Sequence, residues 1–338
     1  MLKRLAAAVA VITGAALIPA ATPAIAQPTT CQEVTYPVTV PGATGQFIAG
    51  TLCKPQGATR LQILVHGGTY NQAYWEYRPE GAPSFREAMN EAGIATLNID
   101  RVGSGRSSKP LSALILADVA AGAIHQVIQQ VRPGFAKVVL VSHSIGTAFA
   151  RIEAATYRDV DGLVNTGLPH LVKPVPAALL LSTLRPVQVA RAGQARAKAW
   201  GADVGYLTTA PGTRYRDFHT PSVEPQAAID YDEANWDVVD PVEVLGAVVE
   251  VVPGTTRSTL ITASVLMVMG ERDSLFCGPG LLSTACTSSA ALKRAEQGYF
   301  PSARSFDAYV VPGTGHSINF GTRSPEQYPV ISGWTNGL

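Results

Sequence analysis

Ser144 has the sequence surroundings of a nucleophile. It stands in the segment 142–146, Ser-His-Ser-Ile-Gly, between an apolar run, Val138–Val141, and a stretch of small residues with helical character. A tight turn from a buried strand into a helix holds a serine at its apex in a strained conformation with its hydroxyl exposed. The residues two before and two after that serine must be small. Gly146 satisfies this requirement, and Ser142 departs from the usual glycine by one hydroxymethyl group.

His316 is the best candidate for the general base that a weakly nucleophilic serine hydroxyl requires. It follows the predicted strand Ala308–Val311 in a short glycine-containing segment, residues 312–317. The other histidines fall in a glycine-rich loop, a predicted helix, the serine turn or a later insertion, and they suit this role less well. They are His66, His125, His143, His170 and His219.

A carboxylate must fix the tautomer of such a histidine and stabilise its charged form. Asp273 follows the predicted strand Ser264–Met269, and Glu271 is a nearby rival. A plain surface carboxylate is the other interpretation of Asp273. The end of the preceding strand offers no acid, since it continues as Thr166–Pro169, and this absence favours Asp273.

Two backbone amides are candidates for stabilising an oxyanion. The N–H of Ile145 stands at the start of the helix that follows Ser144, where helix amides attract negative charge. A second donor is expected from the loop after the strand Leu61–Val65, because glycine allows the backbone to approach closely. Gly68 is the first candidate in that loop and Thr69 the second. His66 is expected to brace the loop by hydrogen bonds.

Strand-like and helix-like segments alternate along most of the chain and must position these residues. A β-hairpin is predicted over Val34–Val40 and Gln46–Leu52. Further strands are predicted at Leu61–Val65, Ile94–Ile99, Lys137–Val141, Gly162–Asn165, Ser264–Met269 and Ala308–Val311, and helices at Ser84–Ala92, Leu114–Val131, Ile145–Ala155 and Glu326–Trp334. The alternation predicts the α/β class, with a mostly parallel central sheet and helices on both faces. Ligands of such sheets bind beyond the carboxyl ends of the strands, where the candidate residues stand.

The alternation stops between about residues 168 and 257, which predicts a cap or lid inserted into the fold. The insertion holds a helical run, Pro176–Trp200, a polar stretch, Tyr206–Trp236, and an apolar stretch, Val242–Val252. A separate domain is the alternative, but no linker-like segment flanks it. Its aromatic residues predict either a partly apolar pocket or packing within the lid: Tyr206, Tyr215, Phe218, Tyr231 and Trp236.

Residues 1–26 have the features of an export signal. Lys3 and Arg4 precede an apolar stretch that runs from Leu5 to about Ala21, and residues 24–26, Ala-Ile-Ala, are small enough for signal peptidase. We therefore expect an extracellular protein with one domain over residues 27–338. An uncleaved anchor is the alternative, although the apolar core is short and weak for a membrane span.

Composition excludes some classes of protein. The chain of 338 residues is 46% hydrophobic and 15% charged, which is typical of a compact protein with a large core. A formal charge of +1, without long basic runs, argues against binding to nucleic acid.

Four cysteines allow three pairings, and the sequence alone does not choose among them. Proximity favours Cys31 with Cys53 and Cys277 with Cys286. Disulfides are the usual state in an oxidising compartment. Zinc binding is the alternative, but the close spacing that structural zinc sites use is missing.

Together these motifs resemble the α/β-hydrolase family over roughly residues 27–338. The order Ser144, Asp273, His316 is the order of that family's triad. The segment Asp100–Ser107 resembles a loop that the family places before the helix leading to the nucleophile. Relatives that open epoxides or remove halides use an aspartate nucleophile, so Ser144 argues against both activities. A cofactor-free haloperoxidase-like reaction stays open.

The expected function is that of a secreted serine hydrolase that cleaves a carboxylic ester or lactone through an acyl-enzyme on Ser144. The substrate is expected to be small to medium and partly apolar. No metal, organic cofactor, nucleic acid or stable membrane insertion is expected. The alternatives are a peptidase or amidase, an enzyme that transfers, cyclises or eliminates an acyl group, and a non-catalytic binding protein. The complete set of triad candidates disfavours the last.

Overall fold

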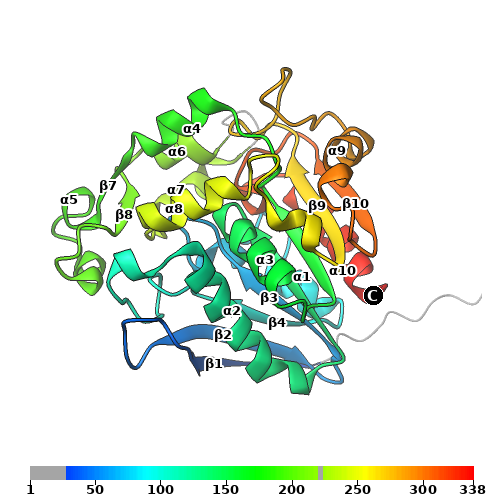
Figure 1. Cartoon of the computed structure of the whole chain (residues 1–338), viewed down its shortest axis with the longest axis horizontal. Helices are drawn as coiled ribbons and strands as arrows, with labels where there is room; N and C mark the ends of the chain where they lie inside the picture. Colours follow the sequence, from blue (N-terminus) through cyan, green and yellow to red (C-terminus); the bar gives the residue numbers. More distant parts are fainter. Residues whose placement is uncertain (1–27, 220–223) are drawn as a thin grey trace, which may run out of the picture.

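The computed structural model describes residues 28–219 and 224–338 (Figure 1). The predicted export signal, residues 1–26, lies outside the described residues. No helix within the described ranges has the length and apolar character that crossing a membrane requires.

An eight-stranded sheet forms the centre of the fold, with the strand order β1-β2-β4-β3-β5-β6-β9-β10. The strands are β1 (Thr29–Pro37), β2 (Phe47–Pro55), β3 (Arg60–Val65), β4 (Ala95–Ile99), β5 (Lys137–His143), β6 (Gly162–Thr166), β9 (Ser264–Gly270) and β10 (Phe306–Val311). β1 and β2 pair antiparallel, β2 pairs antiparallel with β4, and the pairs from β4 to β10 are parallel. This arrangement confirms the predicted fold class.

The central parallel strands are mostly apolar because both faces of the sheet are covered. In β5, Val138 and Leu140 face one hydrophobic core, whereas Val139 and Val141 face the other. Successive side chains of a strand point to opposite faces, so one continuous apolar run supplies both cores.

Helices cover the two faces of the sheet. On one face lie α2 (Ala117–Val131) and α3 (Ile145–Thr156), which pack side by side in front of the sheet in Figure 1. On the other face, α1 (Phe85–Glu91) packs against α10 (Gln327–Asn336). A capping box starts α1: Ser84 Oγ accepts from the Glu87 N–H, and the Glu87 carboxylate accepts from the Ser84 N–H.

The segment between β6 and β9 forms elements outside the sheet, in the upper left of Figure 1. They are α4 (Pro174–Leu181), β7 (Leu184–Pro186), α5 (Val187–Ala190), β8 (Leu207–Thr209), α6 (Arg214–Phe218), α7 (Gln226–Ala234) and α8 (Pro241–Val249). α8 also packs against α2 and α3.

The prediction of a helical run over Pro176–Trp200 is wrong for the middle of that range. β7 interrupts it and pairs antiparallel with β8. Thr183 ends α4, since its hydroxyl donates to the Leu180 carbonyl at 2.7 Å, and Pro186 has no N–H with which to continue a helix. The helix α9 (Ser289–Glu296) was also not expected from the sequence.

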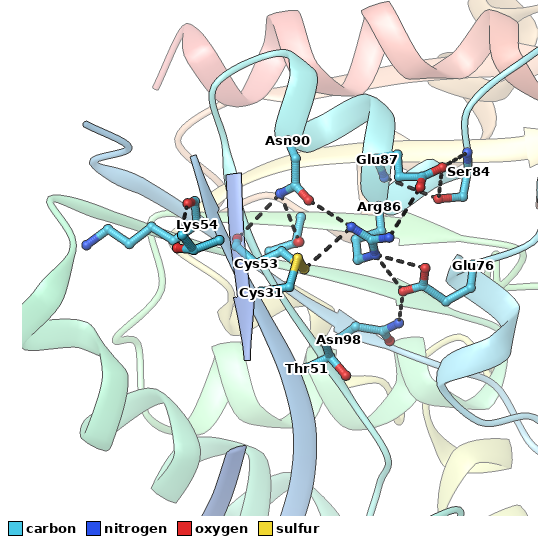
Figure 2. Close-up of a disulfide and its surroundings, with 12 residues drawn as sticks. Cys31, Thr51, Cys53, Lys54, Glu76, Ser84, Arg86, Glu87, Asn90 and Asn98 are labelled. Carbon is cyan, nitrogen blue, oxygen red and sulfur yellow. Dashed lines mark hydrogen bonds and ion pairs between the residues drawn. A yellow bond between two sulfur atoms is a disulfide. The ribbon is translucent and has the colours of Figure 1, made fainter. Parts of the chain in front are cut away.

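The predicted N-terminal hairpin is present as β1 and β2, but its two strands lie further from the connecting turn than the predicted ranges Val34–Val40 and Gln46–Leu52. β1 is mostly exposed, but Cys31 stands opposite Cys53 and forms a disulfide with it. Figure 2 shows Arg86 of α1 beside this bridge: its Nη1 donates to Cys53 Sγ at 3.4 Å and its Nε to Glu76 Oε1 at 2.7 Å. The disulfide thus ties an edge strand with few buried contacts to the sheet.

Cys277 and Cys286 form a second disulfide, so both predicted pairs are present. It closes a loop that begins four residues after Asp273, and the Cys277 N–H donates to the Asp273 carbonyl at 2.9 Å. The loop that carries the candidate acid is therefore anchored at both of its ends.

Candidate active site

Ser144 stands at the junction of β5 and α3 with φ 51° and ψ −130°. A positive φ is strained for a serine, and the packing of the turn maintains it. A Cβ at Gly146 would collide with the His66 carbonyl oxygen and lie 2.9 Å from that of Val65. Glycine at this position lets α3 start directly against the backbone that follows β3.

The hydroxyl of Ser142, at the position where the family usually has glycine, is accommodated inside the sheet. The residue is buried, and its Oγ donates to the Val164 carbonyl on β6 at 3.2 Å. A buried hydroxyl with a hydrogen-bond partner carries little cost, so this departure leaves the turn intact.

The structure brings together the three residues predicted to form the triad. His316 Nε2 is 3.0 Å from Ser144 Oγ, and His316 Nδ1 is 2.8 Å from Asp273 Oδ2. His316 and Asp273 are both buried. When Nδ1–H donates to the carboxylate, Nε2 is left with a lone pair that faces the serine hydroxyl.

Asp273 is fixed by its own loop, whereas Glu271 points elsewhere. Asp273 Oδ1 accepts from the Leu275 N–H at 2.9 Å. Glu271 is exposed and accepts from the Gly313 N–H at 2.7 Å, in the turn before the histidine. A Cβ at Gly270 would collide with the Gly315 carbonyl oxygen, so glycine allows the acid and histidine loops to touch.

The candidate oxyanion donors lie beside the nucleophile. Gly68, Ile145 and Ser144 line the same cavity. The N–H of Thr69, the second candidate, already donates to the Val238 carbonyl at 3.1 Å, and Thr69 has a φ of 61°. This favours Gly68 as the second donor.

His66 braces the loop as expected. Its Nδ1 is 2.8 Å from the Gly67 carbonyl, and its Nε2 accepts from the Arg101 N–H at 3.0 Å. The Asp100–Ser107 loop is thereby joined to the loop that carries Gly68. Burial, followed by the charge of Arg101, lowers the pKa of His66 well below its usual value, so the ring stays neutral.

The cavity at Ser144 measures about 190 Å³, and its walls are almost entirely apolar. Leu168, Val172, Ala177, Leu180, Leu181, Leu184, Phe218, Val239, Val244, Ala247, Val248, Val251, Leu275 and Phe276 complete the lining. Among the five aromatic residues singled out in the sequence, Phe218 lines this cavity. Tyr206 instead packs against the loop after β4 and donates to the Pro110 carbonyl, whereas Trp236 packs inside the β6–β9 segment and donates to the Gln194 side chain.

A buried polar network, not foreseen from the sequence, connects the β6–β9 segment to the histidine loop. Glu224 accepts from the Gly315 N–H at 3.2 Å and is bonded to His219 Nδ1. His219 Nε2 is 2.8 Å from Asp232 Oδ2. Through Glu224, the network therefore contacts the residue that precedes His316.

The same network reaches the oxyanion loop. Arg214 donates to Asp232 Oδ1 at 2.5 Å and to the Thr69 carbonyl at 3.1 Å. Tyr70 Oη lies 2.6 Å from Ser317 Oγ. The residues are scattered over separate segments without a spacing motif, so no signal in a single sequence assigns them this role.

Comparisons with known proteins agree with the fold. Residues 62–328 match the family described as the alpha/beta hydrolase family. Similar solved structures include E-2-(acetamidomethylene)succinate hydrolase (TM-score 0.57, 20% identity, covering 90% of this chain and 100% of that one). Another is a malate-bound thermophilic esterase from Thermogutta terrifontis, with a TM-score of 0.57 and 16% identity over 90% of this chain and 98% of that one. A third is the enol-lactonase from Burkholderia xenovorans LB400, with a TM-score of 0.54 and 13% identity over 87% of this chain and 98% of that one. A search of curated proteins found no match.

The network predicts a loss of stability at alkaline pH. Burial lowers the pKa of His219, but hydrogen bonds to Asp232 and Glu224 outweigh it and raise the pKa to about 9. Since this exceeds the unfolded value of about 6.5, the charged ring contributes fully below pH 6.5, and its contribution is lost as the pH rises through about 9. Between pH 6.5 and 9.5, the free energy of unfolding in urea should fall by about 3 kcal/mol more for the wild type than for His219→Gln. Equal losses in both proteins would contradict this assignment.

Proposed function

The chain belongs to the alpha/beta hydrolase family, and on that premise we propose that it is a secreted serine hydrolase that cleaves a carboxylic ester or lactone. The observation that carries the proposal is the line of contacts from Ser144 Oγ to His316 at 3.0 Å and from His316 to Asp273 at 2.8 Å. It supplies a nucleophile, a base and an orienting carboxylate in hydrogen-bond reach.

In the proposed reaction, His316 Nε2 takes the Ser144 proton as Oγ attacks the substrate carbonyl carbon. The Asp273 carboxylate stabilises the imidazolium that forms. The N–H groups of Ile145 and Gly68 stabilise the tetrahedral oxyanion, each lowering the barrier by about 3 kcal/mol. Collapse breaks the ester C–O bond, and His316 returns the proton to the leaving alcohol. A water molecule, activated by the same histidine, then hydrolyses the acyl-enzyme on Ser144.

The apolar lining of the cavity supports a substrate whose acyl group is uncharged and apolar. Among the described residues that line it, Ser144 and Thr69 have the polar side chains, and none is charged. A carboxylate or ammonium on the acyl chain would lose its hydration there without gaining a partner. The volume of about 190 Å³ suits a chain of a few carbons to medium length.

Export is supported by the two disulfides, which bridge Cys31 with Cys53 and Cys277 with Cys286. Disulfides persist in oxidising compartments and are rare in the cytosol. This agrees with the signal-like residues 1–26. The thermophilic esterase and the enol-lactonase of the comparisons are consistent with ester or lactone chemistry on this fold.

Asp273→Asn separates the two candidate acids. The substitution leaves the shape of the loop but removes the acceptor that fixes the His316 tautomer, so kcat should fall about 10⁴-fold. Glu271→Gln, the matched control two residues away, should change kcat less than about threefold. Steady-state kinetics on an activated ester provide the measurement. A large loss in Glu271→Gln with little in Asp273→Asn would reverse the assignment.

A substrate panel tests the proposed reaction class. 4-Nitrophenyl butyrate should be hydrolysed with a kcat/KM at least about a hundredfold above that of 4-nitrophenyl hemisuccinate, because the described lining of the cavity offers no partner for the free carboxylate of the succinyl group. The matching 4-nitroanilide of butyrate tests amide cleavage. Turnover of the anilide at the rate of the ester, or equal turnover of the charged and uncharged esters, would contradict the proposal.

A further inference from the structure

Three potential ligand side chains converge near the end of α3, away from Ser144 at its start. His125 comes from α2, Glu153 from the last turn of α3, and Asp159 from the loop before β6. One ligand atom of each lies within 4.8 Å of the others. His125 Nδ1 is 2.8 Å from Asp159 Oδ2 and 3.5 Å from Glu153 Oε1. Neighbouring ligands of a tetrahedral ion with bonds of about 2.1 Å are about 3.4 Å apart.

Glu153 is the reason to regard the cluster as a site. Its side chain is 0% exposed, and neither carboxylate oxygen has a hydrogen-bond partner among the described residues. Nδ1 of His125 faces both carboxylates at ion-pair distance, but these contacts do not have the geometry of hydrogen bonds. Buried carboxylates are ordinarily hydrogen-bonded, paired or bound to a metal, because an uncompensated buried charge is costly.

The local field also favours a cation. Glu153 lies at the carboxyl end of α3, where the helix dipole is negative, and the last turn of the helix carries no basic residue. The ion pairs of both carboxylates, Glu153 and Asp159, are with the same histidine.

Surrounding residues hold the three side chains in position. The Tyr157 ring stacks on His125 with centroids 3.7 Å apart and planes 8° apart. Gly122 leaves room for that tyrosine, since a Cβ there would lie 3.3 Å from its hydroxyl. The Gln129 amide donates to Asp159 Oδ2. Such supporting contacts are typical of metal sites, where they orient the ligands.

We propose that His125, Glu153 and Asp159 bind one divalent cation that accepts mixed nitrogen and oxygen ligands, Zn²⁺ or Mn²⁺. The imidazole favours such ions over Ca²⁺ and Mg²⁺, which prefer oxygen ligands alone. His125 is 24% exposed, which leaves access for the ion and for water as a further ligand. The cation would join α2, α3 and the loop into β6. Its role is structural, since the three ligands do not line the Ser144 cavity.

Binding and thermal stability test the proposal without reference to activity. The full-length protein as purified, without a histidine tag, is stripped with EDTA, dialysed, and titrated with Zn²⁺, Mn²⁺, Ca²⁺ or Mg²⁺ by calorimetry. One equivalent of Zn²⁺ or Mn²⁺ should bind. The melting temperature should rise by roughly 5 °C once the free ion exceeds its Kd a hundredfold.

Glu153→Gln and His125→Asn should each abolish this binding and the rise in melting temperature. Asp307→Asn, which changes a half-exposed carboxylate on β10 that pairs with Lys293, should retain both. If Glu153→Gln does not fold, His125→Asn decides, because its side chain is partly exposed. The proposal is overturned if no ion binds stoichiometrically, or if His125→Asn binds as the wild type does. It is also overturned if Glu153→Gln melts higher while no ion stabilises the wild type, since the carboxyl groups then merely share a proton.

Discussion

The close approach of α3 to the backbone after β3 is the constraint on which the site depends. Gly146 has no side chain, so the first turn of α3 lies against the carbonyl groups of Val65 and His66. That contact holds Ser144 at a φ of 51° and places it beside Gly68, which lines the same cavity. The absence of a Cβ at Gly146 therefore allows the strained turn at Ser144 to lie against the loop that carries Gly68. A second glycine, Gly270, lets the loop that carries Asp273 lie against the loop that carries His316, because a Cβ there would collide with the Gly315 carbonyl oxygen.

The parts of the fold that could be predicted are those in which local sequence and tertiary packing agree. Val138–Val141 of β5 and Val265–Met269 of β9 are uninterrupted apolar runs because both faces of the sheet are covered, and such a run reveals a buried strand directly. The triad candidates follow from strand ends and from their order. The choice of Asp273 over Glu271 rested on the absence of an acid after β6. The geometry agrees with that choice, because Asp273 contacts His316 and Glu271 contacts the Gly313 amide.

The parts that could not be predicted depend on contacts between distant segments. The strand pair β7–β8 joins residues that lie more than twenty positions apart: β7 falls within the predicted helical run Pro176–Trp200, whereas β8 falls beyond it in the polar stretch Tyr206–Trp236. The network of Arg214, His219 and Asp232 has no recognisable spacing, although it reaches both Thr69 and Gly315 through its partners. It gives the β6–β9 segment a second role besides lining the cavity, since it supports the loops on either side of Ser144.

The central claim is that Ser144 is the nucleophile of a triad with His316 and Asp273, and covalent labelling tests it most directly. A fluorophosphonate reacts with an activated serine, and intact mass followed by peptide mapping locates the adduct. The wild type should gain one phosphonyl group on Ser144, while Ser144→Ala, folded by circular dichroism, should gain none. Equal labelling of both proteins, or labelling of neither, would contradict the account.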